Sequence, residues 1–387
     1  MQIPQHLLDI ETRVRTNLFP WRGQFSPGLV DILLSTYASP GNVAFDPFAG
    51  VGTTLMEAAR QGISCLGSEL SPAAVAMAET VVFVSLRKEK RKEWLNQAKA
   101  MLDQAFDDEL PLFGGSPATA PNLLGRLAKV GRSDNLNKYV RNIITNILIR
   151  IADDADITEG TIYRAFKQHA KIIENLPYSA SQYAIENTDA RCLSLKDEMV
   201  DFVVTSPPYL NVFNYHQNNR PAMELLGWDV LRVAKSEFGA NRKHRGNRFL
   251  TVVQYCLDMQ GMLLELRRVM KRSGRAVFIV GRESCIRGVP FRNGAIVTAL
   301  AEFSGFRTAL KQERKFKNKF GVLIYEDVLH FLPTDNRHRE RGKAVSLAID
   351  QLRSQLKQDL DEDVRKDLRD AIEGAWQVNP SPIYRPI

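Results

Sequence analysis

The segment from residue 43 to residue 80 constrains the fold more than any other part of the chain. Residues 43–48 combine apolar and aromatic side chains and end in Asp-Pro-Phe, which is typical of a short buried strand that runs into a turn. The turn "AGVGTT" leads into a helix that we expect to end at Gly62, and residues 64–70 form a second strand. A strand, a glycine turn, a helix and a strand make a βαβ unit, so the sequence predicts a parallel sheet.

This α/β pattern is interrupted and then resumes. Residues 85–180 are mostly helical in pattern, and we interpret them as an insertion. Strands are expected again at "YAIENTD", at residues 201–205, at "GRAVFIVG" and at residues 322–332. We therefore predict an α/β fold whose doubly wound, Rossmann-like sheet is built from residues 1–84 and 181–333. A charged helical C-terminal tail covers residues 334–387, where apolar residues every four positions from Ala348 to Trp376 predict a helical stripe.

The glycine turn is a candidate ligand site. Gly50 and Gly52 let the backbone approach a ligand closely, and the helix that begins near Thr53 points free N–H groups at it. A lone Gly-x-Gly is also what any tight strand–helix turn would show. Two acids favour the ligand site, because Asp46 ends the first strand and Glu69 ends the second, where a carboxylate can accept hydrogen bonds from ribose hydroxyls.

The chemistry of this turn favours S-adenosylmethionine over a dinucleotide. A dinucleotide site needs a third glycine where this chain has Leu55, and an acid at the mouth of the turn would repel a pyrophosphate. S-Adenosylmethionine carries a sulfonium, an amino group and a ribose but no phosphate. Asp189, at the end of the next strand along the chain, could accept a hydrogen bond from its adenine amine, although a solvated turn residue is the alternative.

Residues 203–211, "VVTSPPYLN", place a double proline directly after a strand. Two prolines fix the backbone and remove N–H donors, so residues 206–209 form a rigid loop with carbonyls free to accept. The strand 201–205 is the fourth, and the carboxyl ends of strands one and four flank the switch point of a doubly wound sheet. We therefore expect Ser206 and Tyr209 to face the same cleft as the glycine turn and to suit a planar ligand that bears an amine.

Together, "TSPPY" and "DPFAGVGTT" resemble the motifs of the amino-methylating DNA methyltransferases, and the Ser-Pro-Pro-Tyr form resembles their cytosine-N4 branch. The resemblance covers roughly residues 20–80 and 185–332, and it implies a class I methyltransferase sheet with S-adenosylmethionine as cofactor. The glycine motif precedes Ser-Pro-Pro-Tyr here, whereas many cytosine-N4 enzymes have the reverse order. The residues implied for the cofactor are Phe25, Asp46, Phe48, Gly50, Gly52, Thr53, Glu69, Asp189 and Thr205, and those for catalysis are Ser206, Pro207, Pro208 and Tyr209.

The mechanism that this resemblance implies needs no covalent enzyme intermediate. Acceptors at Ser206 and Pro207 favour a pyramidal amine with an exposed lone pair, and Tyr209 stacks on a base flipped out of double-stranded DNA. Ring-carbon methylation of cytosine needs a cysteine nucleophile, usually after a proline, and none of the four cysteines follows a proline. The alternatives are an adenine-N6 DNA methyltransferase, an RNA base-amine methyltransferase and, as the weakest, a non-catalytic DNA-binding subunit. The implied setting is a restriction–modification or defence system, which can include a cognate restriction endonuclease.

The charge distribution suggests where DNA binds. The chain carries a net charge of +8, and residues 240–248 are strongly basic. We predict that phosphates contact this basic loop, that residues just after the tyrosine of the motif line the base pocket, and that the 85–180 insertion is a candidate target-recognition region. A solvated loop and ordinary loop packing are the respective alternatives. The predicted DNA-binding residues are Asn214, Tyr215, His216, Arg242, Lys243, Arg245 and Arg248.

Cysteine usage and apolar patterning bound the remaining possibilities. The four cysteines lie far apart, without a C-x-x-C pair or a zinc spacing, so we expect reduced, buried thiols and no metal. No apolar run approaches the roughly 20 residues of a membrane span, and the first residues show no signal segment. We expect a cytoplasmic protein that does not associate with a membrane.

Overall fold

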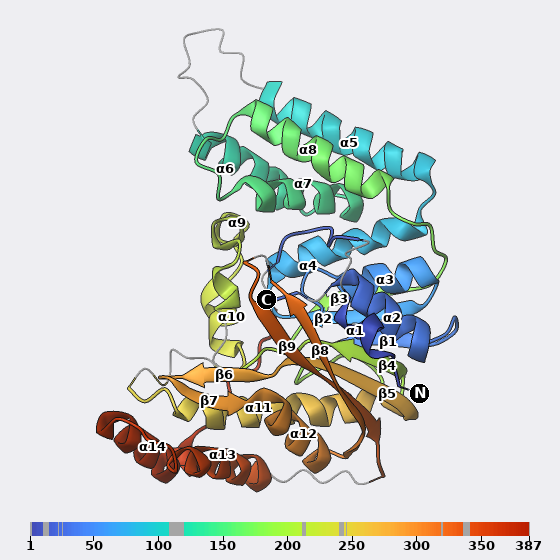
Figure 1. Cartoon of the computed structure of the whole chain (residues 1–387). Helices are drawn as coiled ribbons and strands as arrows, with labels where there is room; N and C mark the ends of the chain where they lie inside the picture. The colour runs from blue at the N-terminus through green and yellow to red at the C-terminus, as the bar shows by residue number, and fades with distance from the viewer. Residues whose placement is uncertain are drawn as a thin grey trace.

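A seven-stranded mixed sheet lies at the centre of the molecule (Figure 1). This computed structural model describes residues 2–10, 15–21, 23–24, 26–107, 120–210, 214–239, 244, 246–318, 320–335 and 341–386. The strands, in chain order, are β1 (Val43–Asp46), β2 (Ser64–Glu69), β3 (Tyr183–Asn187), β4 (Val200–Thr205), β5 (Met270–Gly281), β8 (Phe306–Lys317) and β9 (Leu323–Pro333).

The strand order is β3-β2-β1-β4-β5-β9-β8, and strands β1 to β5 run parallel to one another. Strand β9 is antiparallel to both β5 and β8. The direction of winding reverses between β1 and β4, which pair through Phe45 and Val203. The predicted doubly wound α/β fold is therefore confirmed, and the glycine turn and the Ser-Pro-Pro-Tyr loop leave from neighbouring strands.

Three strands were not expected from the sequence. Strand β8 alternates buried and accessible residues, and its accessible side carries so many charges that the pattern indicates a loop. It lies at the edge of the sheet, where only alternate side chains need to be apolar. The other two, β6 (Glu283–Ile286) and β7 (Val289–Arg292), form a short hairpin of four residues each, too short to show a period.

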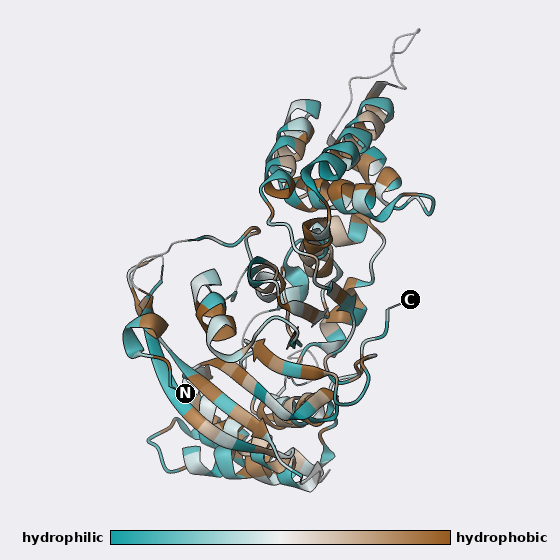
Figure 2. Cartoon of the chain, turned by 90° about the vertical axis from the view of Figure 1, so that its right-hand side faces the viewer, coloured by the Kyte–Doolittle hydropathy of each residue, from teal (hydrophilic) through white to brown (hydrophobic). Residues whose placement is uncertain are grey.

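Helices cover both faces of the sheet (Figure 2). Alternate strand residues belong to the apolar clusters on the two faces. In β4, Phe202 and Val204 pack on one face, and Val203 packs on the other. The first face is covered by α2 (Pro27–Tyr37), α3 (Thr53–Gln61) and α4 (Pro72–Ala78). The second is covered by α11 (Leu250–Val269) and α12 (Asn293–Phe303). Outside them, α13 (Arg341–Gln355) packs on both of these helices, and α14 (Glu362–Gly374) packs on α13.

Three short helices complete this body. They are α1 (Gln5–Asp9), which packs on β8, and α9 (Arg220–Leu225) and α10 (Val230–Ser236), which follow the Ser-Pro-Pro-Tyr loop of residues 206–209. Within the described ranges, no helix is both long enough and apolar enough to cross a membrane. Of the four cysteines, Cys65 and Cys256 are buried, but Cys192 and Cys285 are exposed, so the expectation of buried thiols was wrong for that pair.

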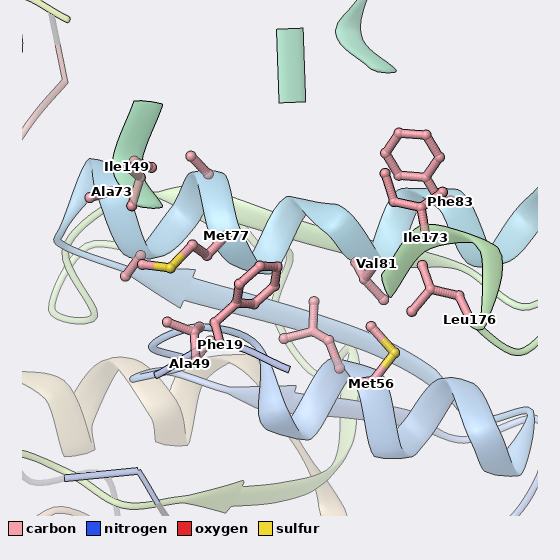
Figure 3. Close-up of a cluster of buried hydrophobic side chains, with 14 of the residues drawn as sticks. Phe19, Ala49, Met56, Ala73, Met77, Val81, Phe83, Ile149, Ile173 and Leu176 are labelled. Atoms are coloured by element: carbon pink, nitrogen blue, oxygen red, sulfur yellow. The ribbon is translucent and has the colours of Figure 1, made fainter. Parts of the chain in front are cut away.

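Four helices between α4 and β3 form a lobe above the sheet (Figure 1). They are α5 (Lys88–Asp107), α6 (Ala120–Gly131), α7 (Lys138–Ile151) and α8 (Glu159–Glu174). The amides of Asn142 and Asn146 in α7 donate to the Ala76 carbonyl of α4, at 2.8 and 2.9 Å. Apolar side chains from the lobe and from the helices over the sheet share one cluster, so the lobe has no separate core (Figure 3).

One buried arginine, Arg91, joins the two ends of this lobe. Its side chain is 1% exposed and lies at the start of α5. The guanidinium donates to three main-chain carbonyls within residues 83–86 and to three within residues 173–177, at 2.6 to 3.4 Å. The chain therefore enters and leaves the lobe around a single side chain.

The predicted helical stripe of the C-terminal tail is divided between two helices. Helix α13 packs on α11 and buries Ala348 and Leu352, and α14 buries Leu368. Trp376, the last residue of the expected stripe, is exposed instead. Beyond a short 3₁₀ turn, residues 379–386 run without helix or strand and return to the end of β3.

Candidate active site

A pocket opens at the carboxyl edge of the parallel strands. It encloses about 1190 Å³, including the part that is open to solvent. Its wall is formed by the glycine turn, the ends of β2 and β3, the Ser-Pro-Pro-Tyr loop and residues 233–239. Nine residues predicted from the sequence lie in its wall: Phe48, Gly50, Thr53, Glu69, Asp189, Ser206, Pro208, Asn214 and Tyr215.

The two glycines of the turn differ in what they do. Both have positive φ, +52° at Gly50 and +85° at Gly52, a conformation that other residues rarely adopt. Gly50 lines the pocket beside Trp21. A Cβ on Gly52 would come within 2.9 Å of the Ala78 Cβ, so Gly52 lets the turn pack against the end of α4.

Glu69 closes the glycine turn from the end of β2. One of its carboxylate oxygens accepts from the Gly50 N–H at 2.9 Å, and the other accepts from the Ser71 N–H at 2.8 Å. Burial raises the pKa of this carboxyl to about 7, against the lowering effect of these backbone donors. Each oxygen has a further lone pair, so the side chain can still accept hydrogen bonds from a diol in the pocket.

Asp46 is buried and connects the glycine turn to the Ser-Pro-Pro-Tyr loop. It accepts from the Thr54 hydroxyl and from the Thr205 hydroxyl, both at 2.6 Å, and from the Phe48 N–H at 3.1 Å. Burial raises its pKa to about 6, and these three donors oppose that rise. Neither Asp46 nor Thr205 lines the pocket, so in this structure the pair acts as a bridge that fixes the separation of the two motifs.

The Ser-Pro-Pro-Tyr loop of residues 206–209 is held by hydrogen bonds of its own Tyr209 and of Tyr255 in α11. The Tyr209 hydroxyl lies 3.3 Å from the Ser206 hydroxyl and 3.4 Å from a Glu326 carboxylate oxygen. The Tyr255 hydroxyl donates to the Pro208 carbonyl at 3.0 Å. The Tyr209 ring packs on Gly281, where an added Cβ would come within 2.8 Å of it. Ser206 and Pro208 line the pocket, and Pro207 and Tyr209 are not among its lining residues.

Asp189 is 2% exposed, and its carboxylate is occupied by protein donors. One oxygen accepts from the Arg191 N–H and Nε, at 3.0 and 2.8 Å. The other accepts from Arg191 Nη2 at 2.6 Å and from the Tyr384 N–H at 3.0 Å. A carboxylate has about four acceptor positions, so these four bonds fill it.

Sequence reasoning missed Arg191 and the aromatic wall that it supports. The guanidinium carbon lies 5.1 Å from the centre of the Phe238 ring, and Phe238 meets Phe48 edge to face at 5.3 Å. Phe238, Phe48 and Trp21 all line the pocket. The Asp-Ala-Arg spacing of residues 189–191 was visible in the sequence, but no pattern there names Phe238 as a neighbour.

The residues predicted to bind DNA fall in different environments. Asn214 is exposed and lines the pocket with Tyr215, and Arg248 is exposed just before α11. His216 is 2% exposed, and its Nδ1 and backbone N–H reach the two Glu237 oxygens at 2.9 and 2.6 Å. This contact fixes the loop that carries Asn214 and Tyr215. Four predicted residues lie outside the described residues: Phe25, Arg242, Lys243 and Arg245.

Comparison with known proteins gives the family. The strand order and the pocket define a class I methyltransferase, and a family model described as DNA methylase matches residues 9–80. The type II methyltransferase M.MjaII of Methanocaldococcus jannaschii is 34% identical, over 80% of this chain and 79% of that protein. M.BsoBI of Geobacillus stearothermophilus, also a type II methyltransferase, is 22% identical over 56% and 53%. The chain belongs to the type II DNA methyltransferases, and its cofactor is S-adenosylmethionine.

A solved structure is similar at a greater distance. A methyltransferase from Methanosarcina mazei, described as dependent on S-adenosylmethionine, aligns with 78% of this chain and 97% of that one, at 12% identity and a TM-score of 0.36.

Proposed function

We propose that this DNA methyltransferase acts on the N4 amine of a cytosine flipped out of the duplex, in a restriction–modification or defence system. The observation that carries the proposal is the bridge at Asp46. It holds Thr205, and therefore the adjacent Ser206, at a fixed distance from the glycine turn. A rigid separation between the cofactor side and the acceptor side is what an in-line group transfer requires. The serine that opens the motif supports cytosine rather than adenine.

The glycine turn and Glu69 form the cofactor half of the site. Glu69 is placed to accept from the ribose hydroxyls, and the turn at Gly50 lets the backbone approach closely. Phe48 and Phe238 provide an apolar wall for a planar ring. When bound, S-adenosylmethionine supplies the electrophilic methyl group, and the residues of this chain do the rest by orientation.

The catalytic loop forms the acceptor half of the site. The Tyr255 hydroxyl already occupies the Pro208 carbonyl, so Ser206 and the Pro207 carbonyl are the acceptors for the two amine hydrogens. Acceptors positioned for a tetrahedral nitrogen favour the pyramidal form of the amine, and in that form the lone pair is less conjugated with the ring. Tyr209, held on Gly281, stiffens the loop and stacks on the flipped base.

The DNA half of the site is proposed to lie around the same opening. Asn214 and Tyr215 line the base pocket, and the His216–Glu237 contact holds their loop. Arg248 and the adjacent basic loop bind phosphates, with the helical lobe of residues 85–180 in the role of target recognition. The body of residues 1–84 and 181–333 is the catalytic domain.

Analysis of methylated bases by mass spectrometry tests this proposal. DNA from cells that express the protein is expected to contain N4-methylcytosine. Ser206→Ala and Tyr209→Ala are expected to abolish it, while the exposed Ser35→Ala leaves it intact. N6-Methyladenine would instead assign the enzyme to the adenine branch. A wild-type sample without any modified base would refute the proposal.

A further inference from the structure

The last described residues of the chain form an extended segment against the pocket. We call residues 379–384 the strap. It follows the 3₁₀ turn Ala375–Gln377 and crosses α11, where Gln254 donates to the Asn379 carbonyl at 3.3 Å. Ser381 and Tyr384 are buried, although Pro382 and Ile383 between them are exposed. The strap therefore docks through two separate residues.

The first docking residue is Ser381. Its N–H donates to one Asp258 oxygen at 2.8 Å, and its hydroxyl lies 2.7 Å from the other. The same hydroxyl is 2.9 Å from the Glu237 carbonyl, which belongs to the pocket wall. Asp258 is fully buried in α11, so this contact fixes the strap to the core.

The guanidinium of Arg191 links the strap to the pocket. It lies between two buried carboxylates, with Nη2 2.6 Å from Asp189 and Nη1 2.5 Å from Asp258. The two Nη atoms also donate to main-chain carbonyls, at Ser381 and Pro382 in the strap and at Ser236 in the pocket wall. Arg191 is thus held partly by the strap, and it in turn holds Asp189 and the Phe238 ring.

The second docking residue is Tyr384. Its N–H takes one of the four acceptor positions of Asp189, and its hydroxyl donates to the Asn187 amide oxygen at 2.9 Å. The Asn187 amide nitrogen donates to the carbonyls of Glu69 and Leu70, both at 3.0 Å. Tyr384 therefore contacts the end of β3 directly and is linked to the end of β2 through the Asn187 side chain.

We propose that the strap fixes the shape of the adenine end of the cofactor pocket, with Arg191 and Tyr384 as positioning residues for cofactor binding. The inference rests on the proposed function, in which Phe48 and Phe238 form the wall for a planar ring, and on the predicted position of adenine beside Asp189 at the end of β3. Asp189 is saturated by Arg191 and the strap, so it holds its loop in place rather than receiving the adenine amine through a free oxygen. A wall that is ordered before binding loses less conformational freedom when the ligand enters.

Calorimetric titration with two probes tests the strap. S-Adenosylhomocysteine and adenosine alone are each titrated into the full-length wild type, Tyr384→Phe and Ser381→Ala. One lost hydrogen bond is worth about a three- to tenfold rise in Kd, and we expect it for both probes, because the defect lies at the adenine end. Arg385→Ala, an exposed change beside Tyr384, is the matched control and is expected to bind as the wild type does.

Thermal unfolding separates positioning from simple stabilisation. The ligand-induced rise in Tm is expected to shrink in Tyr384→Phe and Ser381→Ala. A lower Tm without ligand combined with unchanged Kd values would show that the strap only stabilises the fold, and would overturn the inference. A wild type that binds neither probe would refute the proposed pocket and the strap with it, whereas tight wild-type binding with unaffected variants would refute the strap alone.

Discussion

The two ends of the cofactor pocket are built in different ways. At the glycine turn, the bonds that shape the site join residues close in sequence, such as Gly50 with Glu69, 19 residues apart, and Asp46 with Thr54, 8 residues apart. At the β3 end, Arg191 reaches Ser381, 190 residues away, and Asp189 reaches Tyr384, 195 residues away. The first end is set by a short motif, and the second exists only once the whole chain has folded.

The largest expected effect comes from Arg191→Met, which tests the end built from distant residues. The change leaves Asp189 and Asp258 buried without their common cation. Removing one partner of a buried ion pair costs about 3–5 kcal/mol, so the free energy of unfolding in urea should fall by that amount. Arg272→Met, an exposed arginine, should change it little. A loss below about 1 kcal/mol would mean that this end does not depend on Arg191.

Asp46→Asn is the corresponding test at the motif end. An amide offers one acceptor oxygen where the carboxylate offered two, so either Thr54 or Thr205 loses its partner. The catalytic loop then shifts relative to the glycine turn, and we expect kcat/KM for DNA methylation to fall about 100-fold. The exposed Asp350→Asn, in α13, is the control. Unchanged methylation would show that the separation of the motifs is fixed by other contacts.

Acidity provides a third test, through Glu69. Its pKa is raised to about 7, so the carboxylate that we propose accepts from the ribose hydroxyls becomes protonated as the pH falls below 7. Affinity for S-adenosylhomocysteine should then weaken by up to tenfold per pH unit, and Glu69→Gln should bind weakly with that dependence removed. Calorimetry between pH 5.5 and 8.5 measures both. A profile that stays flat in the wild type would contradict this role.

The same raised pKa has the opposite effect on the pH dependence of the stability of the ligand-free protein. The folded state holds the Glu69 proton more tightly than the unfolded state, whose carboxyl titrates near 4.5. The contribution of Glu69 to stability therefore falls as the pH rises from about 4.5 to 7. The ligand and the fold thus favour different protonation states of one side chain.

Gly281→Ala has the smallest expected effect and separates the acceptor half from the cofactor half. The new methyl group would meet the Tyr209 ring, which must move by some tenths of an ångström. We expect kcat to fall about tenfold, since Tyr209 positions the loop, while the Kd of S-adenosylhomocysteine stays unchanged. Gly342→Ala, where an added Cβ would meet only an ordinary contact with Trp376 at 3.8 Å, is the control. An equal loss in both quantities would show that the two halves are not independent.

The difference between the two ends also explains what the sequence could predict. Strand–turn–helix patterns are local, so β1, β2 and the glycine turn were predicted, and chain order alone placed β4 beside β1. That order brought Ser206 to the wall that Gly50 also lines. The strap and Phe238 carry no local signal for a pocket, because their role depends on contacts with residues far along the chain. Asp46 was predicted as a ligand-facing acid, but its hydroxyl partners became visible only in three dimensions.

Arg91 has a consequence for how this enzyme can vary. One guanidinium binds the backbone of residues 83–86 and of residues 173–177, so the two segments that connect the sheet to the lobe are held together. The distance that the chain must span between β2 and β3 is therefore fixed by these two segments, whatever the number of helices in the lobe. Helices of another length can therefore replace those of the lobe without a change in the register of the parallel strands, provided that they keep the apolar contacts and the Asn142 and Asn146 hydrogen bonds to α4. The methyl-transfer chemistry and the surface above it are free to diverge at different rates.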